Sequence, residues 1–412
     1  MEIFVFNILR YFLYFLFIIS GMIIMRIPVL FNKKNNRLYW LSVLFPIILY
    51  SFMEGTRWKR GVDYMYNFRI ANIIVKSHDF LYDTYALLLN KMGISWIFFF
   101  VTISFLLIWS IILYAKLYHK AFLPMTILVY AFTMQQSENL MRQYTAISLV
   151  LIALYFFHRR GYFYVVIFSF FAYFTHSSSL FVIPFVLVAF FCLKYNHKYI
   201  FIKYFYVFFF VLYMIAPFLS NLLANHIAEV FSYMNVGMSA KYLDSEYVDK
   251  AIDITGKTTA FKAYATDSIL DYIRSNIRNS VVILLGGYFL TKRLAVFDVI
   301  KKVRKSNNLL LEKYKEQNSF MYISWFLACC GIIYLRILPD FDMEVMYRLS
   351  LYLYIFVYYI EGVLVYIYIK KRKGRKYIYF KLLMILLIII ECIWVFKWNN
   401  GATCGLKFIW LK

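Results

Sequence analysis

Long apolar stretches separated by polar connections run through most of the chain. A membrane-spanning helix needs about 20 mostly apolar residues, and twelve stretches are near that length. We therefore predict an all-α, polytopic transmembrane protein with about twelve spans. The predicted spans are 3–25, 38–52, 94–114, 121–134, 140–157, 162–174, 180–193, 204–223, 281–290, 320–335, 349–369 and 378–396.

Composition places the chain in the membrane class. Of its 412 residues, 63% are apolar, 22% are aromatic and only 16% are charged. A soluble fold with this composition would have too little polar surface. Four of the five cysteines fall inside predicted spans, so no disulfide or metal framework is indicated. We expect residues 1–412 to form a single integral membrane domain.

Basic residues are concentrated in every second connection between the spans. These connections hold 25 Lys and Arg with three Asp and Glu, whereas the opposite connections and the C-terminal tail hold 18 Lys and Arg against 15 Asp and Glu. Because Lys and Arg accumulate on the cytoplasmic side, we predict that both termini lie outside. The net charge of +24 then reflects topology and attraction to anionic lipid, and no nucleic-acid binding is expected.

Three connections are long. Two lie on the predicted outer side, at 54–93 and 222–276, and long loops commonly form lids or binding surfaces. Residues 80–89 of the first loop have a helical periodicity that predicts an amphipathic helix along the membrane interface. The third, at 291–319, is a basic cytoplasmic loop that we expect to form an amphipathic surface helix.

The first outer loop begins with a cluster of charged and aromatic residues. A helical start would place Arg57, Arg60 and Tyr64 on one face, because residues three and four apart are neighbours. Two planar guanidinium groups there are suited to bind a phosphate or pyrophosphate, with Asp63 beside them. A solvated loop whose arginines touch lipid headgroups is an equal alternative.

The fifth span opens with a polar run at its outer end. Asn139, Arg142 and Gln143 are predicted to lie on one helical stripe, and Glu138 can pair with Arg142 at a spacing of four. A charge near the membrane boundary is costly unless it is satisfied, which favours a functional role. A structural Glu138–Arg142 pair or simple snorkelling of the arginine is the alternative.

Two further residues on the predicted outer side are candidates, the titratable His176 and the cationic Arg348. His176 follows the sixth span, and because imidazole exchanges protons near neutral pH it is suited to take a proton from a sugar hydroxyl. The alternative is a hydrogen-bonded structural histidine followed by helix-capping serines. Arg348, in the outer connection before a late span, would bring another cation to the same surface.

Four motifs follow one another along the predicted outer side. They are Arg60-Gly61-Val62-Asp63-Tyr64 after the second span, Met141-Arg142-Gln143 in the fifth, His176-Ser177-Ser178 after the sixth, and Tyr347-Arg348-Leu349-Ser350 before a late span. Their order resembles the EpsG family of bacterial polysaccharide polymerases, relatives in role of the Wzy O-antigen and capsule polymerases. The resemblance covers most of the chain. Val62 is a departure, since family members commonly have threonine there.

The resemblance implies glycosyl transfer on the outer face of the bacterial cytoplasmic membrane, by a multi-pass protein with a GT-C-like architecture and two outer loops over the site. Undecaprenyl-pyrophosphate-linked repeat units would be joined into O-antigen, capsular or exopolysaccharide. No cofactor or metal is expected, because arginines would stabilise the pyrophosphate, although Asp340-Phe-Asp342 has a spacing found at metal sites. Membrane lipid is an expected partner, and a chain-length regulator is left open.

The same resemblance gives each candidate residue a role. Pyrophosphate binding is expected of Arg57, Arg60, Arg142 and Arg348, general base catalysis of His176 or else Asp63, and substrate positioning of Tyr64, Asn139, Gln143 and Glu138. Two alternatives stay open, an O-antigen ligase-like transferase and a flippase or transporter of lipid-linked sugars. A flippase tends to have charges around a midplane cavity and inverted repeats, whereas the spans here contain few charges and no evident repeat.

Overall fold

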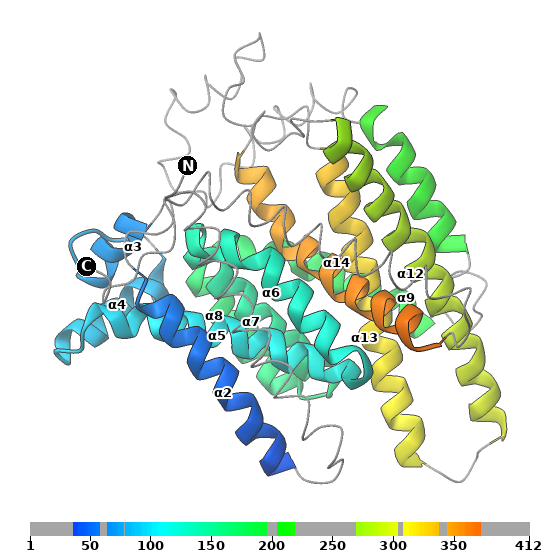
Figure 1. Ribbon diagram of the computed structural model, residues 1–412, viewed down its shortest axis with the longest axis horizontal. Coiled ribbons are helices and arrows are strands. Elements are labelled where there is room, and N and C mark those ends of the chain that lie inside the picture. The colour runs from blue at the N-terminus through cyan, green and yellow to red at the C-terminus, as the bar shows by residue number, and fades with distance from the viewer. Residues whose placement is uncertain are drawn as a thin grey trace, which may run out of the picture. The chain divides into compact units, whose positions relative to one another are not determined.

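The computed structural model describes residues 36–57, 64–77, 79–195, 204–218, 269–303, 308–337 and 344–371. Within these ranges the chain is helical and contains no β-strand (Figure 1). An unlabelled helix covers Tyr204–Phe218. The labelled helices are α2 (Asn36–Gly55), α3 (Tyr64–Ala71), α4 (Phe80–Lys91), α5 (Trp96–Ala115), η1 (Lys116–Ala121), α6 (Phe122–Asn139), α7 (Met141–His158), α8 (Tyr162–Thr175), η2 (Ser177–Phe181), α9 (Val182–Tyr195), α12 (Ile269–Val303), α13 (Asn308–Ile337) and α14 (Glu344–Lys371).

The all-α prediction is confirmed for the described part of the chain, where each predicted span coincides with a helix. Among the described residues, three segments are long and apolar enough to cross a membrane, Trp96–Tyr118, Gln317–Ile337 and Arg348–Ile367, and shorter apolar helices accompany them. The chain is thus a helical membrane protein. The first and last predicted spans lie outside the described residues, and the GT-C-like arrangement stays a prediction.

The helix predicted at 80–89 is confirmed as α4, and its place along the membrane interface stays a prediction. Its Tyr82, Ala86 and Leu89 are buried, whereas Leu87 and Leu88 are exposed. Three- and four-residue spacing of the buried positions is the signature of a helix with one packed face. The described part of the 54–93 segment therefore includes a helix with one packed face.

Two helix boundaries differ from the predictions. The helix α6 continues to Asn139, and the backbone at Leu140 is non-helical (φ −103°, ψ 50°) before α7 begins. Asn139 therefore ends α6 whereas Arg142 and Gln143 belong to α7, so the three residues do not lie on one continuous helix as predicted. The basic connection at 291–319 is also not one surface helix, because α12 runs on to Val303 and α13 begins at Asn308.

The chain divides into two compact units, residues 1–180 with 361–412, and residues 181–360. In the first unit, α5 packs against α2 and α7, and α7 packs against α8 (Figure 1). Short helices α3 and α4 contact each other and α5. Their buried side chains join those of α5 in one apolar cluster that includes Ile70, Tyr82, Leu89, Phe99 and Phe100. This cluster fixes the first outer loop to the helix bundle.

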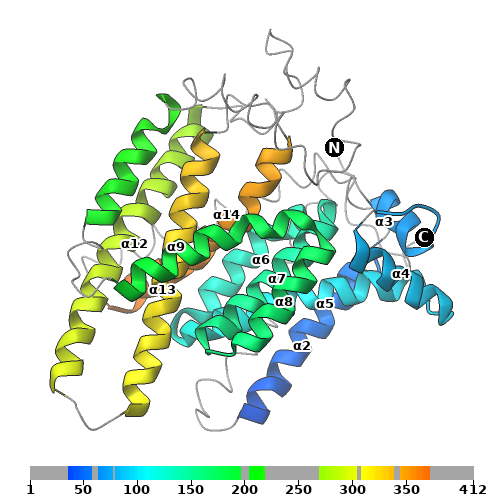
Figure 2. The same ribbon diagram turned by 180° about the vertical axis from the view of Figure 1, so that it is seen from behind.

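In the second unit, α12 and α13 run side by side, as both views show (Figure 2). The indole Nε1 of Trp325 on α13 donates a hydrogen bond of 3.2 Å to the carbonyl of Ile283 on α12. Gly286 lies against the same indole, where an added Cβ would be 2.7 Å from a ring carbon. A small residue at this point lets the two helices approach closely.

Candidate functional site

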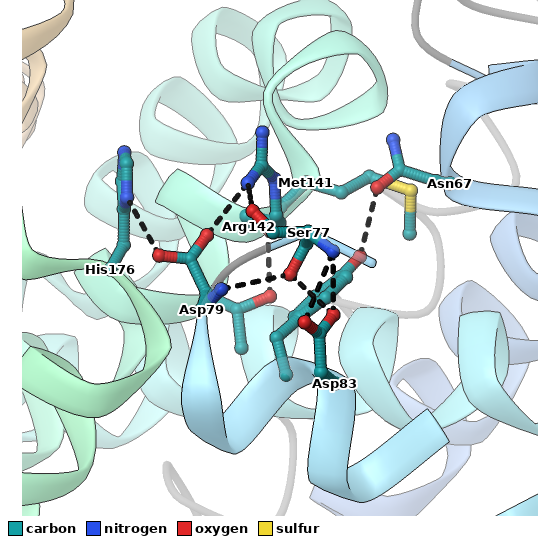
Figure 3. A network of polar contacts seen from close by, with 9 residues as sticks. Asn67, Ser77, Asp79, Asp83, Met141, Arg142 and His176 are labelled. Carbon is teal, nitrogen blue, oxygen red and sulfur yellow. Dashed lines mark hydrogen bonds and ion pairs between the residues drawn. The ribbon is translucent and has the colours of Figure 1, made fainter. Parts of the chain in front are cut away.

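Two side chains from different helices of the first unit lie next to one carboxylate, that of Asp79. Asp79 accepts a hydrogen bond of 2.7 Å from Nη1 of Arg142 at its Oδ2, and its Oδ1 lies 3.6 Å from Nδ1 of His176 (Figure 3). The arginine stands at the start of α7 and the histidine at the end of α8. We call Asp79, Arg142 and His176 the Asp79 cluster.

The backbone around Asp79 is held by a local hydrogen-bond network. The carboxylate of Asp83 accepts bonds from the backbone N–H of Ser77 (2.8 Å) and from its hydroxyl (2.6 Å). The same hydroxyl accepts a bond from the N–H of Asp79. Asp79 occupies the N-cap position of α4, yet its side chain makes no capping hydrogen bond. Its carboxylate is directed instead to Arg142 and His176 (Figure 3).

Arg142 is fixed by contacts on two sides of its guanidinium. Besides Asp79, Nη1 donates a 3.0 Å hydrogen bond to the backbone carbonyl of Ser77. The Tyr66 ring of α3 lies under the guanidinium, 5.5 Å from Cζ to the ring centroid, a separation at which cation–π attraction is favourable. The planar arginine therefore has a defined orientation beside an aromatic face.

His176 ends α8 in an extended conformation (φ −164°, ψ 111°), which turns the chain into the short helix η2. Its side chain is 27% exposed, compared with 24% for Arg142 and 15% for Asp79. The Nδ1 atom is buried and faces Asp79. The exposed surface of the imidazole therefore belongs to the rest of the ring. In Figure 3 the imidazole and the guanidinium lie on either side of the carboxylate, one next to each of its oxygens.

The helices around this cluster explain why these three residues meet. The helix α4 packs against α8, with Phe80 next to Asp79 contacting Phe174 near the end of α8 (ring centroids 5.6 Å apart). The helix α4 also contacts α3, where the hydroxyl of Tyr82 donates a hydrogen bond to Asn67. Predicted topology places the first outer loop, the start of α7 and the end of α8 on one side of the membrane, and the structure brings these segments together.

Arg57 has very different surroundings from those expected. It is not in a helix, so the predicted helical face shared with Arg60 and Tyr64 does not begin at this residue. The whole residue is only 2% exposed, and its Nη1 lies 3.1 Å from the equally buried carboxylate of Glu54. Its Nη2 contacts Sδ of Met141 at 2.9 Å, and Phe100 lies below it.

A cavity of about 10 Å³ adjoins this buried ion pair, with Ser137, Met141 and Tyr144 among its lining residues. That volume is enough for about one water molecule and far too small for a sugar. Arg57 and Glu54 are thus packed between α2, α5 and α7 and do not form part of a substrate cleft within the described residues.

Two other candidates are also buried in the first unit. Tyr64 is 1% exposed and packs against Phe68 and Phe100, and burial raises the pKa of its phenol. Gln143 is 2% exposed. Neither side chain presents a surface to a large substrate, so any positioning effect would be exerted through neighbouring residues.

The remaining candidates are not placed at this cluster. Arg60 and Asp63 lie outside the described residues, as does the Asp340-Phe-Asp342 segment, and the side chains of Glu138 and Asn139 are not described. Arg348 belongs to the second unit. The predicted Glu138–Arg142 pair therefore stays untested, and the partner that the structure gives Arg142 is Asp79.

Asp79 is the functional candidate that the sequence motifs missed. An aspartate directly before an amphipathic helix is normally interpreted as an N-cap residue, which hides any other role. The signal that would have identified it is topological, because Asp79 is an acid in the same outer loop that faces Arg142 and His176.

Together, a guanidinium and an imidazole at one partly exposed surface can bind an anion and accept a proton from a nearby hydroxyl. In the part of the chain that the structure describes, no group of three or more His, Cys, Asp and Glu is placed to hold a metal ion. The expected chemistry without a metal stays a prediction.

Comparison with known proteins gives one match. A model of the EpsG family matches residues 43–403. Neither the curated proteins nor the solved structures searched contain a match to the chain.

Proposed function

The chain belongs to the EpsG family, whose members are exopolysaccharide and Wzy-like polymerases, and on that premise we propose that it joins undecaprenyl-pyrophosphate-linked oligosaccharide repeat units into a polysaccharide. The observation that supports this most directly is the Asp79 cluster. It brings Arg142 and His176, from the ends of two helices, to one partly exposed surface.

The donor in this proposal is the growing glycan on its lipid pyrophosphate, and the acceptor is a hydroxyl of the next lipid-linked repeat. A bond forms between the acceptor oxygen and the anomeric carbon, and the bond from that carbon to the pyrophosphate oxygen breaks. The acceptor proton passes to the exposed nitrogen of His176, acting as general base. The electron pair of the broken bond leaves with undecaprenyl pyrophosphate.

Negative charge develops on the departing pyrophosphate, and a fixed cation lowers the energy of that transition state. Arg142 is suited to this task because its guanidinium is held in place by Asp79, Ser77 and Tyr66. The ring of Tyr66 also offers a face for a sugar. Arg60 is proposed as a further pyrophosphate contact and Asp63 as an alternative base, and pyrophosphate binding by Arg348 of the second unit stays a prediction.

Burial changes the roles proposed for Arg57, Tyr64 and Gln143. Arg57, in its ion pair with Glu54, is proposed to support the packing beneath the site, in place of the direct pyrophosphate contact expected from sequence. Tyr64 and Gln143 are proposed to position substrate through their neighbours, and Asn139 and Glu138 to do so directly. We also propose that the site faces outward from the cytoplasmic membrane and works without a metal ion.

Deletion of the gene and reconstitution of the protein test this function. The deletion strain is expected to accumulate single repeats on the lipid carrier, and purified protein is expected to extend repeats extracted from that strain with no energy source. Extension should persist in the presence of a chelator.

Two results would assign a different activity. Full-length polymer accumulating on the lipid carrier after deletion would indicate a ligase-like transferase. Repeats that accumulate on the inner leaflet, together with purified protein that does not extend them, would indicate a flippase or transporter.

A further inference from the structure

We propose that Asp79 is a positioning residue for the transfer reaction, holding His176 and Arg142 in their working orientations with one carboxylate. This inference rests on the proposed function, because it assigns how the base and the cation of that reaction are held. Asp79 acts through its two partners and is not itself assigned a contact with substrate.

The first argument is the unused capping role. An aspartate at an N-cap position normally accepts a hydrogen bond from a backbone N–H in the first helical turn, and that interaction contributes about 1 kcal/mol. Asp79 occupies this position but makes no such bond. The carboxylate is turned away from its own helix toward α7 and α8. Its orientation is explained by Arg142 and His176 and not by the needs of α4.

The second argument concerns the two oxygens. Oδ2 accepts from Arg142 and Oδ1 faces Nδ1 of His176, so each partner has its own oxygen. The hydrogen bonds from Arg142 to Ser77 and to Asp79 both use Nη1. The carboxylate therefore fixes the guanidinium at one nitrogen while its other N–H groups point elsewhere (Figure 3).

For the histidine, the proposed role of the carboxylate is to accept from Nδ1 when substrate is bound. A group that accepts at Nδ1 favours the tautomer with the proton on Nδ1, which leaves Nε2 as the proton acceptor. The present 3.6 Å separation is longer than a hydrogen bond, and catalytic hydrogen bonds commonly tighten only when substrate is bound. Because the Nδ1 edge is buried, the Nε2 edge is the one available to an acceptor hydroxyl.

The test uses steady-state extension of lipid-linked single repeats, extracted from a deletion strain, by purified full-length protein. Asp79→Asn keeps the shape of the side chain but removes its charge and its second acceptor oxygen. We expect kcat to fall about 10- to 100-fold, as for other residues that orient catalytic groups, with KM changed less than about threefold. Asp79→Glu, which retains the carboxylate, is expected to recover part of the lost kcat.

The matched control is Thr84→Ala on the same helix. Thr84 is exposed, and its hydroxyl donates a hydrogen bond to the carbonyl of Phe80 within α4. The kcat of the Thr84→Ala variant should therefore stay close to that of the wild type. A combined Asp79→Asn and His176→Ala variant should lose less than the product of the two single losses, because the residues act as a unit. Thermal unfolding of each variant in detergent separates misfolding from lost positioning.

The outcomes separate the two levels of the proposal. Wild-type protein that does not extend the repeats overturns the proposed function, and the role of Asp79 with it. Wild-type extension together with unchanged kcat in Asp79→Asn, or single losses that multiply in the combined variant, overturns the positioning role alone.

Discussion

Arg57 and Arg142 belong to the same unit but have different surroundings. These surroundings favour a structural role for Arg57 and a chemical role for Arg142. Arg57 is enclosed with Glu54 in a tightly packed region, whereas Arg142 is partly exposed beside Asp79 and Tyr66. Both are sequence-based candidates for pyrophosphate binding, Arg57 from residue type and spacing and Arg142 from the family resemblance. Their different exposure supports assigning direct substrate contact to Arg142.

At this residue scale, breaking the buried ion pair should destabilise the protein. Arg57→Gln or Glu54→Gln breaks the buried ion pair by removing one of its two charges, and such changes typically cost about 3 to 5 kcal/mol. The double replacement Glu54→Leu with Arg57→Met should recover much of that loss, because well-packed apolar side chains can substitute for a buried pair. Thermal unfolding in detergent measures both effects. Normal stability of Arg57→Gln with lost polymer synthesis would instead make Arg57 a substrate contact.

The sequence identified Arg142 and His176 because their residue types stand out at the ends of apolar spans. It did not identify Asp79, since an aspartate before a helix already has a sufficient local explanation as a cap. The sequence also does not predict the burial of Arg57. Its partner Glu54 lies three residues earlier, where the sequence predicts the start of a loop and the structure has the end of α2.

Helix packing at the element scale depends on close approach at particular glycines. Gly55 ends α2 beside α5, where an added Cβ would lie 2.8 Å from the Cα of Val101. Backbone cannot yield as a flexible side chain can, so Gly55→Ala should destabilise the protein by about 1 to 3 kcal/mol. Gly161→Ala is the control, because its added Cβ would meet a Phe156 ring atom at 3.3 Å. Equal thermal unfolding of the two variants would contradict a tight α2–α5 contact.

Hydrophobic periodicity predicted the helices well and their ends less well. The amphipathic pattern of α4 was sufficient to place it, because buried and exposed positions alternate with the helical period. The break at Leu140 was not predictable, since no Pro or Gly marks it. The α12 and α13 helices continue into basic sequence, where Lys, Glu and Leu favour helix without an apolar stretch.

At the scale of the whole molecule, the basic connections predict which end of the bundle faces the cytoplasm. Lys76 precedes Asp79, and Arg159 follows the opposite end of α7 from Arg142. An 18-residue helix is about 27 Å long, close to the thickness of the bilayer core. In a cysteine-free background, Lys76→Cys should react with an impermeant maleimide in intact cells, and Arg159→Cys only after permeabilisation. The reverse pattern would place the Asp79 cluster in the cytoplasm.

Family membership and the meeting of three distant segments at Asp79 lead to one central claim, that this cluster performs glycosyl transfer. Its most direct test is the size profile of the glycan in a deletion strain that expresses His176→Ala at the wild-type protein level. Loss of a general base typically slows a reaction about 10²- to 10⁴-fold, so we predict single repeats and little or no polymer, as in the deletion itself. Polymer of wild-type length and amount would contradict the account.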